Sequence, residues 1–486
     1  MGAPARAGAL MSGSAMGSIG AGMADATRPR LRAHFLVRIL MLLTLAFAAT
    51  AQPAAAQSIL RDAETEALFN EMSRPLIEAA GLTPDNVKIV LVHDRSINAF
   101  VAGGQIVYMH SGLIAAADNA NEVQGVIAHE LGHITGGHVL RFHEGVKVAT
   151  GIMLLSLVLG AAAMAAGAGE AGAGIMAAGQ QAAMGKFLAF TRTQESAADA
   201  AGASFLTKSG ISGKGSLGFF KKLQNQEFRY AIPQEDSYAR THPLSGERMA
   251  ALEQVYKAAP SWETKTDPGL EARFQRVKAK LFGFVDDPKR TLQKYPESDK
   301  SVPARYARAY AWHKTAYPER ALEEVDALLR DNPNDPFYLE LRGQVLLESG
   351  RPEEALASLR TAVQRAPDQP LISALFGHAL IATEKPQNFD EAKRVLKAAI
   401  GRDNSNPFAW YQLGIVYDRE GDSARAALAT AERYNLEGQP RLALANAEHA
   451  LRSIPTGTPD WLRAQDIAMV SRTAVETQKR GHDGRK

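Results

Sequence analysis

Residues 125–138 read Gly-Val-Ile-Ala-His-Glu-Leu-Gly-His-Ile-Thr-Gly-Gly-His, an apolar run with two histidines four positions apart. An α-helix places positions i and i+4 on one face, so the ring nitrogens of His129 and His133 can reach one metal ion. Glu130 lies beside them and is suited to take a proton from a metal-bound water. The stretch therefore predicts a helix that carries two metal ligands and a general base.

A third protein ligand is needed, because a hydrolytic metal site keeps one of its four positions for water or substrate. A histidine six positions after the second would complete one arrangement, but position 139 is valine and His138 is one residue short. A later segment offers Glu195 and Asp199 at helical spacing. One carboxylate could bind the metal while the other holds the outer nitrogen of a ligating histidine. Such a site would hydrolyse peptide bonds; two core histidines beside a buried glutamate are the structural alternative.

The composition narrows the ligand chemistry and the class of partner. The chain has 486 residues, no cysteine and 12 histidines, so histidine and carboxylate side chains are the strong ligands available. Its 55 basic and 52 acidic residues nearly cancel to a net charge of +3 and form no long block of one sign. We therefore expect no nucleic-acid partner. The length predicts at least two domains.

The N-terminal region has the features of an export signal. Arginines precede an apolar run from Ile39 to Ala49, and small-x-small triplets follow it. The triplets predict cleavage near Gln52 or Gln57, and we favour the second position. Residues 1–56 are therefore expected to be a signal peptide region. An uncleaved anchor is the alternative, and Met23 is an alternative start of translation.

A repeat occupies the C-terminal part of the chain. Ala309, Gly343 and Gly377 follow one another at intervals of 34 residues, and prolines and alanines keep the same interval. This period is typical of tetratricopeptide repeats, and we predict about four of them. A small insertion falls at 385–389 in the third. Such repeats form an α-solenoid with a concave docking surface, and a helical solenoid of another family is the alternative.

The chain before the repeats is expected to be mainly helical with a small β-sheet. Stretches of β character occur at Val87–Val92 and Ala99–Met109, and the second would be an edge strand that pairs an extended substrate. The expected domains are a metallopeptidase domain at 57–262, a connector at 263–300, the repeats at 301–455 and a C-terminal tail at 456–486.

An apolar stretch lies between the two segments that carry candidate ligands. Val148–Gly169 has no charged residue and is long enough to span a bilayer. Its second half is rich in alanine and glycine and is therefore only weakly hydrophobic. The stretch also lies between two helices that must meet at one metal ion, and a membrane span between them would hinder that meeting. We interpret it as a helical hairpin or flexible flap near the active site and leave open whether it touches a membrane surface. A buried core helix is the alternative.

Three segments together resemble the HtpX and BepA-like gluzincin metallopeptidases. In order, they are the HExxH helix, Arg192-x-Gln-Glu195-x-x-Ala198-Asp199 and Thr241-His242-Pro243. The run from Asn98 to Leu113 is similar to the strand and turn before the zinc helix of that family. The export signal and the repeats match its periplasmic BepA type better than its multi-span HtpX type.

The resemblance implies a set of site residues and a biological role. It implies one zinc ion per chain, held by His129, His133 and Glu195, with Glu130 as catalytic base. Asp199 would hold the outer nitrogen of a ligating histidine. It also implies a periplasmic endopeptidase that degrades misassembled or stalled outer-membrane proteins and docks to their assembly machinery through the repeats. A periplasmic chaperone or adaptor with latent protease activity is the alternative.

His242 and Arg248 match the downstream motif of the family and are candidate catalytic residues. Arg248 could stabilise the developing oxyanion, although a capping or core role explains it equally well. His242 could bind the transition state, or it could enter the open metal position and keep the enzyme latent. Pro243 disfavours helix at His242, so the imidazole could project inward.

Overall fold

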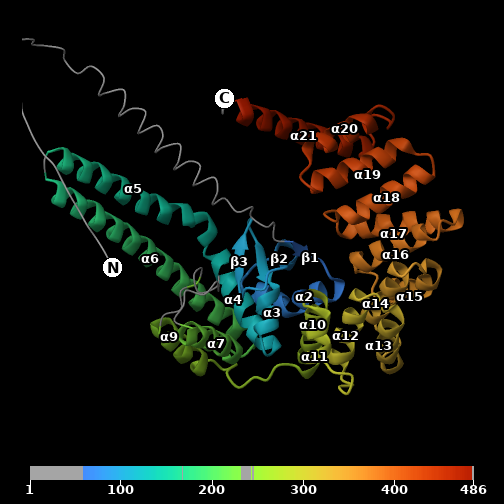
Figure 1. Cartoon of the computed structure of the whole chain (residues 1–486), viewed down its shortest axis with the longest axis horizontal. Coiled ribbons are helices and arrows are strands. Elements are labelled where there is room, and N and C mark those ends of the chain that lie inside the picture. The colour runs from blue at the N-terminus through green and yellow to red at the C-terminus, as the bar shows by residue number, and fades with distance from the viewer. Residues whose placement is uncertain (1–57, 167, 231–241, 243–245, 484–486) are drawn as a thin grey trace, which may run out of the picture. The chain divides into compact units, whose positions relative to one another are not determined.

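The computed structural model describes residues 58–166, 168–230, 242 and 246–483 (Figure 1). The expected signal peptide region lies outside these residues, as do Thr241 and Pro243. The described part of the chain is mainly helical, with one small mixed sheet followed by a series of helical pairs. The fold class expected from the sequence is thereby confirmed.

The sheet has four strands in the order β1-β2-β4-β3, which are Ile59–Leu60 (β1), Lys88–Val92 (β2), Ala99–Ala102 (β3) and Ile106–His110 (β4). Strands β2 and β4 are parallel, and both outer pairs are antiparallel. The expectation of a single edge strand over Ala99–Met109 is wrong, because this stretch forms a hairpin. Gly103 and Gly104 turn the chain with φ of +60° and +97°. Of the two hairpin strands, β3 therefore lies at an edge of the sheet and β4 is an interior strand.

Helix α4 (Ala120–Thr135) is the central element of the N-terminal domain. Its first turn is capped by Asn119, whose side chain accepts a hydrogen bond from the amide of Glu122. Every residue from Ala120 to His133 is buried. This happens because α4 packs against β3 and against α2 (Ala63–Ala79), α6 (Gly169–Lys208) and α7 (Lys214–Tyr230).

Glycines let α4 approach two of its neighbours closely. A β carbon on Gly132 would lie 2.6 Å from the backbone oxygen of Ala198 in α6. A β carbon on Gly125 would lie 2.5 Å from the Cα of Ser216 in α7. Because a side chain cannot fit in either place, Gly132 sets the distance between the HExxH helix and α6, which carries Glu195, and Gly125 sets the distance to α7.

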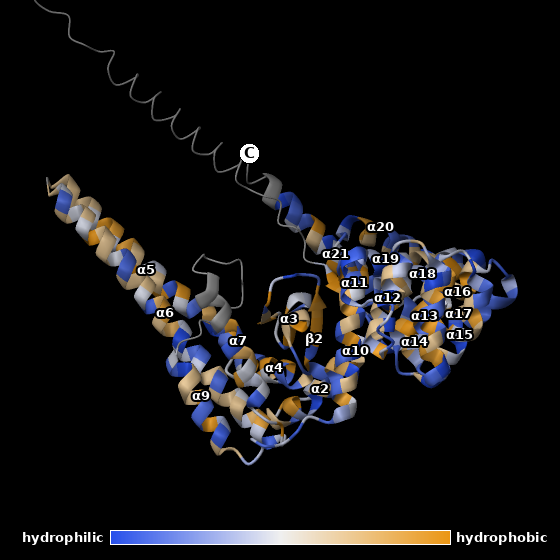
Figure 2. Cartoon of the chain, turned by 60° about the horizontal axis from the view of Figure 1, so that its bottom comes forward, coloured by the Kyte–Doolittle hydropathy of each residue, from blue (hydrophilic) through white to orange (hydrophobic). Residues whose placement is uncertain are grey.

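Helices α5 (His138–Ala165) and α6 pair as a long antiparallel hairpin that projects from the N-terminal domain in both views (Figures 1 and 2). The apolar stretch Val148–Gly169 thus forms part of a helical hairpin, as interpreted from the sequence. The alternative of a buried core helix is wrong, because only 6% of the most apolar window of α5 is buried. Among the described residues, α5 is the one helix long and apolar enough to cross a membrane.

The region expected as a connector, 263–300, contains helices α10 (Pro268–Val285) and α11 (Pro288–Lys294). Helix α10 packs on the first repeat helix and contributes buried residues to the core of the N-terminal domain. Buried charges reinforce this junction. Glu64 of α2 accepts a 2.6 Å hydrogen bond from the hydroxyl of Tyr306 and pairs with Arg276 and Lys280 of α10. These opposite charges compensate one another in an interior that would penalise any of them alone.

The C-terminal helices form antiparallel pairs that match the predicted repeat. Gly343 and Gly377 lie where paired helices cross, since a β carbon there would be 2.4 and 2.6 Å from the Cγ of Leu359 and Leu396. The last helix packs on the two before it, so the described residues form five helical pairs where about four repeats were predicted. Much of the expected C-terminal tail, 456–486, thus belongs to this last helix. The helices are α12 (Val302–Lys314), α13 (Pro318–Asp331), α14 (Pro336–Glu348), α15 (Pro352–Arg365), α16 (Pro370–Ala382), α17 (Phe389–Arg402), α18 (Pro407–Arg419), α19 (Ser423–Leu436), α20 (Pro440–Leu451) and α21 (Pro459–Asp483).

Gly132→Ala should destabilise the protein by about 1–3 kcal/mol, because the added methyl group collides with the backbone of α6. It should also reduce bound metal without changing any candidate ligand. Denaturant titration and metal analysis measure the two effects. Gly151→Ala is the matched control, since a β carbon on this α5 residue meets no atom within 4 Å. Equal losses in both variants would show that the close contact does not set the site.

Candidate metal centre

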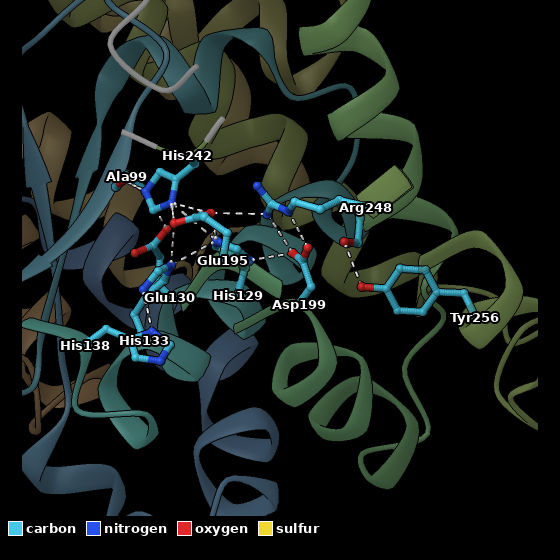
Figure 3. Close-up of polar contacts among 11 residues, drawn as sticks. Ala99, His129, Glu130, His133, His138, Glu195, Asp199, His242, Arg248 and Tyr256 are labelled. Carbon is cyan, nitrogen blue, oxygen red and sulfur yellow. Dashed lines mark hydrogen bonds and ion pairs between the residues drawn. The ribbon is translucent and has the colours of Figure 1, made fainter. Parts of the chain in front are cut away.

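Four buried side chains converge beside the sheet, and we call them the metal group. They are His129 and His133 of α4, Glu195 of α6, and His242 (Figure 3). Their possible ligand atoms all lie within 4.8 Å of one another. The group unites side chains that are separated by up to 113 positions in the chain.

The distances within the metal group fit a tetrahedral zinc site. Nε2 of His129 lies 3.1 Å from Nε2 of His133, and each of these nitrogens is 3.4 Å from a carboxylate oxygen of Glu195. Nδ1 of His242 is 3.3 Å from Nε2 of His129 and 3.1 Å from both oxygens of Glu195. Ligands about 2.0–2.1 Å from a tetrahedral ion stand about 3.3 Å apart. The donor atoms and their spacing therefore suit zinc.

The tautomer of His242 supports the same conclusion. Its Nε2 lies 3.3 Å from the carbonyl oxygen of Ala99 on β3 and can donate a hydrogen bond there. In that tautomer Nδ1 presents a lone pair toward the carboxylate of Glu195. A lone pair and a carboxylate at this distance repel each other unless a cation lies between them. The arrangement is thus suited to a metal ion.

Each histidine of α4 also has a partner on its outer nitrogen. Oδ1 of Asp199 lies 3.0 Å from Nδ1 of His129. Nδ1 of His138 lies 3.0 Å from Nδ1 of His133. Outer contacts of this kind fix the orientation of the imidazole and leave the other nitrogen for the metal.

Arg248, on α9 (Gly246–Ala258), binds the carboxylates of the site. Its Nε and Nη2 donate to the two oxygens of Asp199 at 2.6 and 2.9 Å, and Nη2 also lies 3.2 Å from Oε2 of Glu195. These contacts favour a positioning role for Arg248. The expected oxyanion role stays a prediction.

The electrostatics keep the carboxylates ionised. Burial raises the pKa of Glu195, but its close contacts with His129, His133 and His242 outweigh burial and hold this pKa well below its usual range. Burial likewise raises the pKa of Asp199, and its contacts with His129 and Arg248 bring it below the ordinary value. Burial lowers the pKa of His138 to about 4, so its neutral ring can accept the Nδ1–H of His133.

Glu130 is fully buried next to the metal group. Neither of its carboxylate oxygens has a hydrogen-bond partner among the described residues. The nearest ionisable contact is Nε2 of His242, 3.6 Å from Oε1. A buried carboxylate without a partner is costly, and here it stands where a general base would be needed.

His138 is the site residue whose role the sequence analysis missed. It was weighed as a third ligand, but it contacts the outer nitrogen of His133 instead. The signal was the pair Gly136-Gly137. Gly137 adopts φ of +61° and turns the chain between α4 and α5, and a β carbon on Gly136 would lie 2.3 Å from Nε2 of His138.

Comparison with known proteins agrees with this geometry. Residues 60–256 match the model of peptidase family M48, and residues 318–370 and 385–440 match that of the tetratricopeptide repeat. The chain carries a peptidase family M48 domain followed by tetratricopeptide repeats. The resemblance noted in the sequence is thereby confirmed.

Three curated relatives illustrate the similarity. The putative beta-barrel assembly-enhancing protease of Vibrio cholerae is 25% identical over 292 residues, which are 58% of this chain and 59% of the relative. The beta-barrel assembly-enhancing protease of Escherichia coli K12 is 24% identical over 281 residues, 56% of each chain. Metalloprotease LoiP of the same organism is 33% identical over 168 residues, 34% of this chain and 60% of the relative. The chain thus spans little more than half the length of these relatives.

Metal analysis of variants should separate a ligand from its supporting partner. Glu195→Ala should lose most of the bound zinc, because two histidines alone leave the site incomplete. His138→Ala should weaken zinc affinity by about 10- to 100-fold and still bind zinc at saturation. His143→Ala, an exposed α5 histidine, is the control and should bind normally. If His138→Ala abolished zinc binding while Glu195→Ala retained it, the third ligand would be His138.

Proposed function

We propose that the chain is a zinc-dependent endopeptidase of the cell envelope. One zinc ion per chain would be held by His129, His133 and Glu195, with Glu130 as the base. The observation that carries this proposal is the buried metal group, whose atoms have tetrahedral spacing and adjoin the unpartnered carboxylate of Glu130. The family M48 domain supports the same chemistry.

The proposed substrates are misassembled or stalled outer-membrane proteins in the periplasm, and the repeats would dock to the machinery that assembles them. Two observations support this assignment. Two relatives that match 58% and 56% of this chain are named beta-barrel assembly-enhancing proteases. The repeats are of a type that forms protein-binding surfaces.

The chemistry follows from the arrangement of the side chains. Bound zinc supplies a Lewis acid that makes water nucleophilic near neutral pH. Glu130 takes the proton of the attacking water and passes it to the leaving amine. Asp199 and His138 contact the outer nitrogens of His129 and His133 and so fix the orientation of the two imidazoles. Arg248 holds Glu195 and Asp199 in place and balances their charge.

The edge of the sheet provides a place for the substrate. Strand β3 pairs with β4 on one side, and its other side is where an extended peptide could add as a further strand. The carbonyl of Ala99 is within hydrogen-bonding distance of His242 at 3.3 Å. A peptide that pairs along β3 up to Ala99 would therefore have to displace His242.

Replacement of the general base tests the proposed activity. Glu130→Gln should retain zinc and cleave an unstructured reporter protein about 10²–10⁴-fold more slowly, because proton transfer is lost while the ligands remain. Glu144→Gln, at an exposed carboxylate on α5, is the matched control and should cleave normally. Equal cleavage by Glu130→Gln and the unaltered chain would refute a zinc peptidase.

A chaperone or adaptor with latent proteolysis is a second candidate, and the position of His242 favours latency. Its Nδ1 lies 3.3 Å from Nε2 of His129 and 3.1 Å from Oε1 of Glu195, where it would compete with water for a zinc ion held by the other three side chains. Under this hypothesis His242→Ala should raise cleavage of the reporter while zinc is retained. A fall in cleavage with zinc still bound would instead assign His242 to the transition state.

The repeats should act in recruitment and not in chemistry. Deletion of 368–486 removes α16–α21 but keeps α12–α15, including Tyr306, which hydrogen-bonds to Glu64. We expect zinc binding and cleavage of the soluble reporter to persist, and processing of outer-membrane proteins in cells to fail. Zinc content and the melting temperature verify that the remaining domain is folded. Normal processing in cells would exclude a docking role for the deleted helices.

A further inference from the structure

The hairpin of α5 and α6 exposes a continuous apolar surface. Its apolar section, Val148–Ala165, contains no charge, and Glu170 is the only charged residue between Lys147 and Lys186. Seven large apolar side chains in this section are each 51–64% exposed, and they are Val148, Met153, Leu154, Leu155, Leu157, Val158 and Leu159. Side chains at nearly consecutive positions point to all sides of a helix. Docking into a protein groove would need apolar side chains on only one face of the helix. Figure 2 shows this arm mainly in orange and pale colours, interrupted by blue segments.

The packing inside the hairpin is of the kind found between membrane helices. A β carbon on Gly172 would lie 2.5 Å from the backbone oxygen of Gly160, and one on Gly179 would lie 2.0 Å from the Cβ of Ser156. The hydroxyl of Ser156 donates to the carbonyl of Met153 at 2.8 Å within the same helix. Glycine and serine lie at these close approaches beside Met164 and Met176, while most of the large apolar residues of α5 face outward, which is the reverse of a soluble hairpin.

Length and charge select a lipid bilayer as the partner. The apolar section rises through roughly 27 Å, close to the thickness of about 30 Å of a bilayer's hydrocarbon core. Arg141, Lys147 and Lys186 lie at the base of the hairpin with Glu144, which gives the base a net positive charge. Basic side chains at that level can bind anionic lipid phosphates. Glu170 begins the return helix at the tip, where it would reach the opposite polar layer.

We propose that the α5–α6 hairpin inserts tip first into a lipid bilayer and holds the metal group at a fixed height above it. Helix α6 continues without a break from the tip to Glu195. The nine residues from Lys186 to Glu195 correspond to roughly 14 Å of helix. If the proposed peptidase function holds, its substrates are therefore extended polypeptide segments lying within this distance of the membrane surface.

Vesicle flotation tests the insertion. The full exported chain, free of detergent, is mixed with vesicles of phosphatidylethanolamine and phosphatidylglycerol and centrifuged through a density gradient. We expect it to float, and we expect Leu154→Asp/Val158→Asp to reduce binding by more than about tenfold, since charges in the bilayer core are strongly disfavoured. Met469→Asp/Val470→Asp on α21 is the matched control and should float normally. Its two side chains are 52% and 62% exposed, against 58% and 64% at the hairpin positions.

Site-specific fluorescence tests the depth of insertion. The chain has no cysteine, so single cysteines labelled with a polarity-sensitive dye report one position each. A label at Leu155→Cys should shift to the blue on addition of vesicles. A label at Leu140→Cys, at the base of the hairpin and 82% exposed, should shift little. Equal shifts at both positions would contradict tip-first insertion.

Three outcomes would overturn the proposal. The unaltered chain could remain unbound, or the hairpin and control double variants could behave alike. Sedimentation could also show a dimer that Leu154→Asp/Val158→Asp dissociates while the unaltered chain fails to float, which would assign the hairpin to contact between copies. Zinc content and reporter cleavage are measured on the same samples. If the chain floats but neither it nor its His242→Ala variant cleaves the reporter, the peptidase function is refuted and insertion is left intact.

Discussion

The contact of Gly132 in α4 with the backbone of Ala198 in α6 is the constraint on which the metal group depends. The two helices approach so closely there that a single β carbon would not fit. His129 lies three residues before Gly132, His133 directly follows it, and both histidines face Glu195 of α6. The pair of helices therefore acts as a rigid frame, and the separation of the ligands follows from the absence of a side chain and not from any polar bond.

The electrostatics of the site depend on this frame. Glu195 and Asp199 are buried and ionised, and so they require positive charge or hydrogen-bond donors on every side. Arg248 donates a hydrogen bond to Asp199. His129 contacts both Glu195 and Asp199. A divalent cation among the ligand atoms would complete the balance. Such a site gains its metal affinity from the fold, because the unfolded chain cannot bring these charges together.

Helix α6 links two features that are far apart in space. Its N-terminal half belongs to the exposed apolar hairpin, and its C-terminal half carries Glu195 and Asp199. Any surface that binds the hairpin is thereby connected to the metal group through one uninterrupted helix. At the other side of the domain, the buried pairing of Glu64 with Arg276 and Lys280 joins the repeats to the same core. The site thus lies between two rigid attachments.

The sequence alone determined the HExxH helix, the carboxylates at helical spacing and the 34-residue repeat, because these depend on local periodicity that the chain carries in its own order. It placed a hairpin at Val148–Gly169 but could not decide its exposure, which depends on what packs against it. It also took Ala99–Met109 for one strand and overlooked the contact of His138 with His133. Only the tertiary structure decided these points and brought His242 beside His129, His133 and Glu195. Each point depends on contacts between segments that local sequence does not specify.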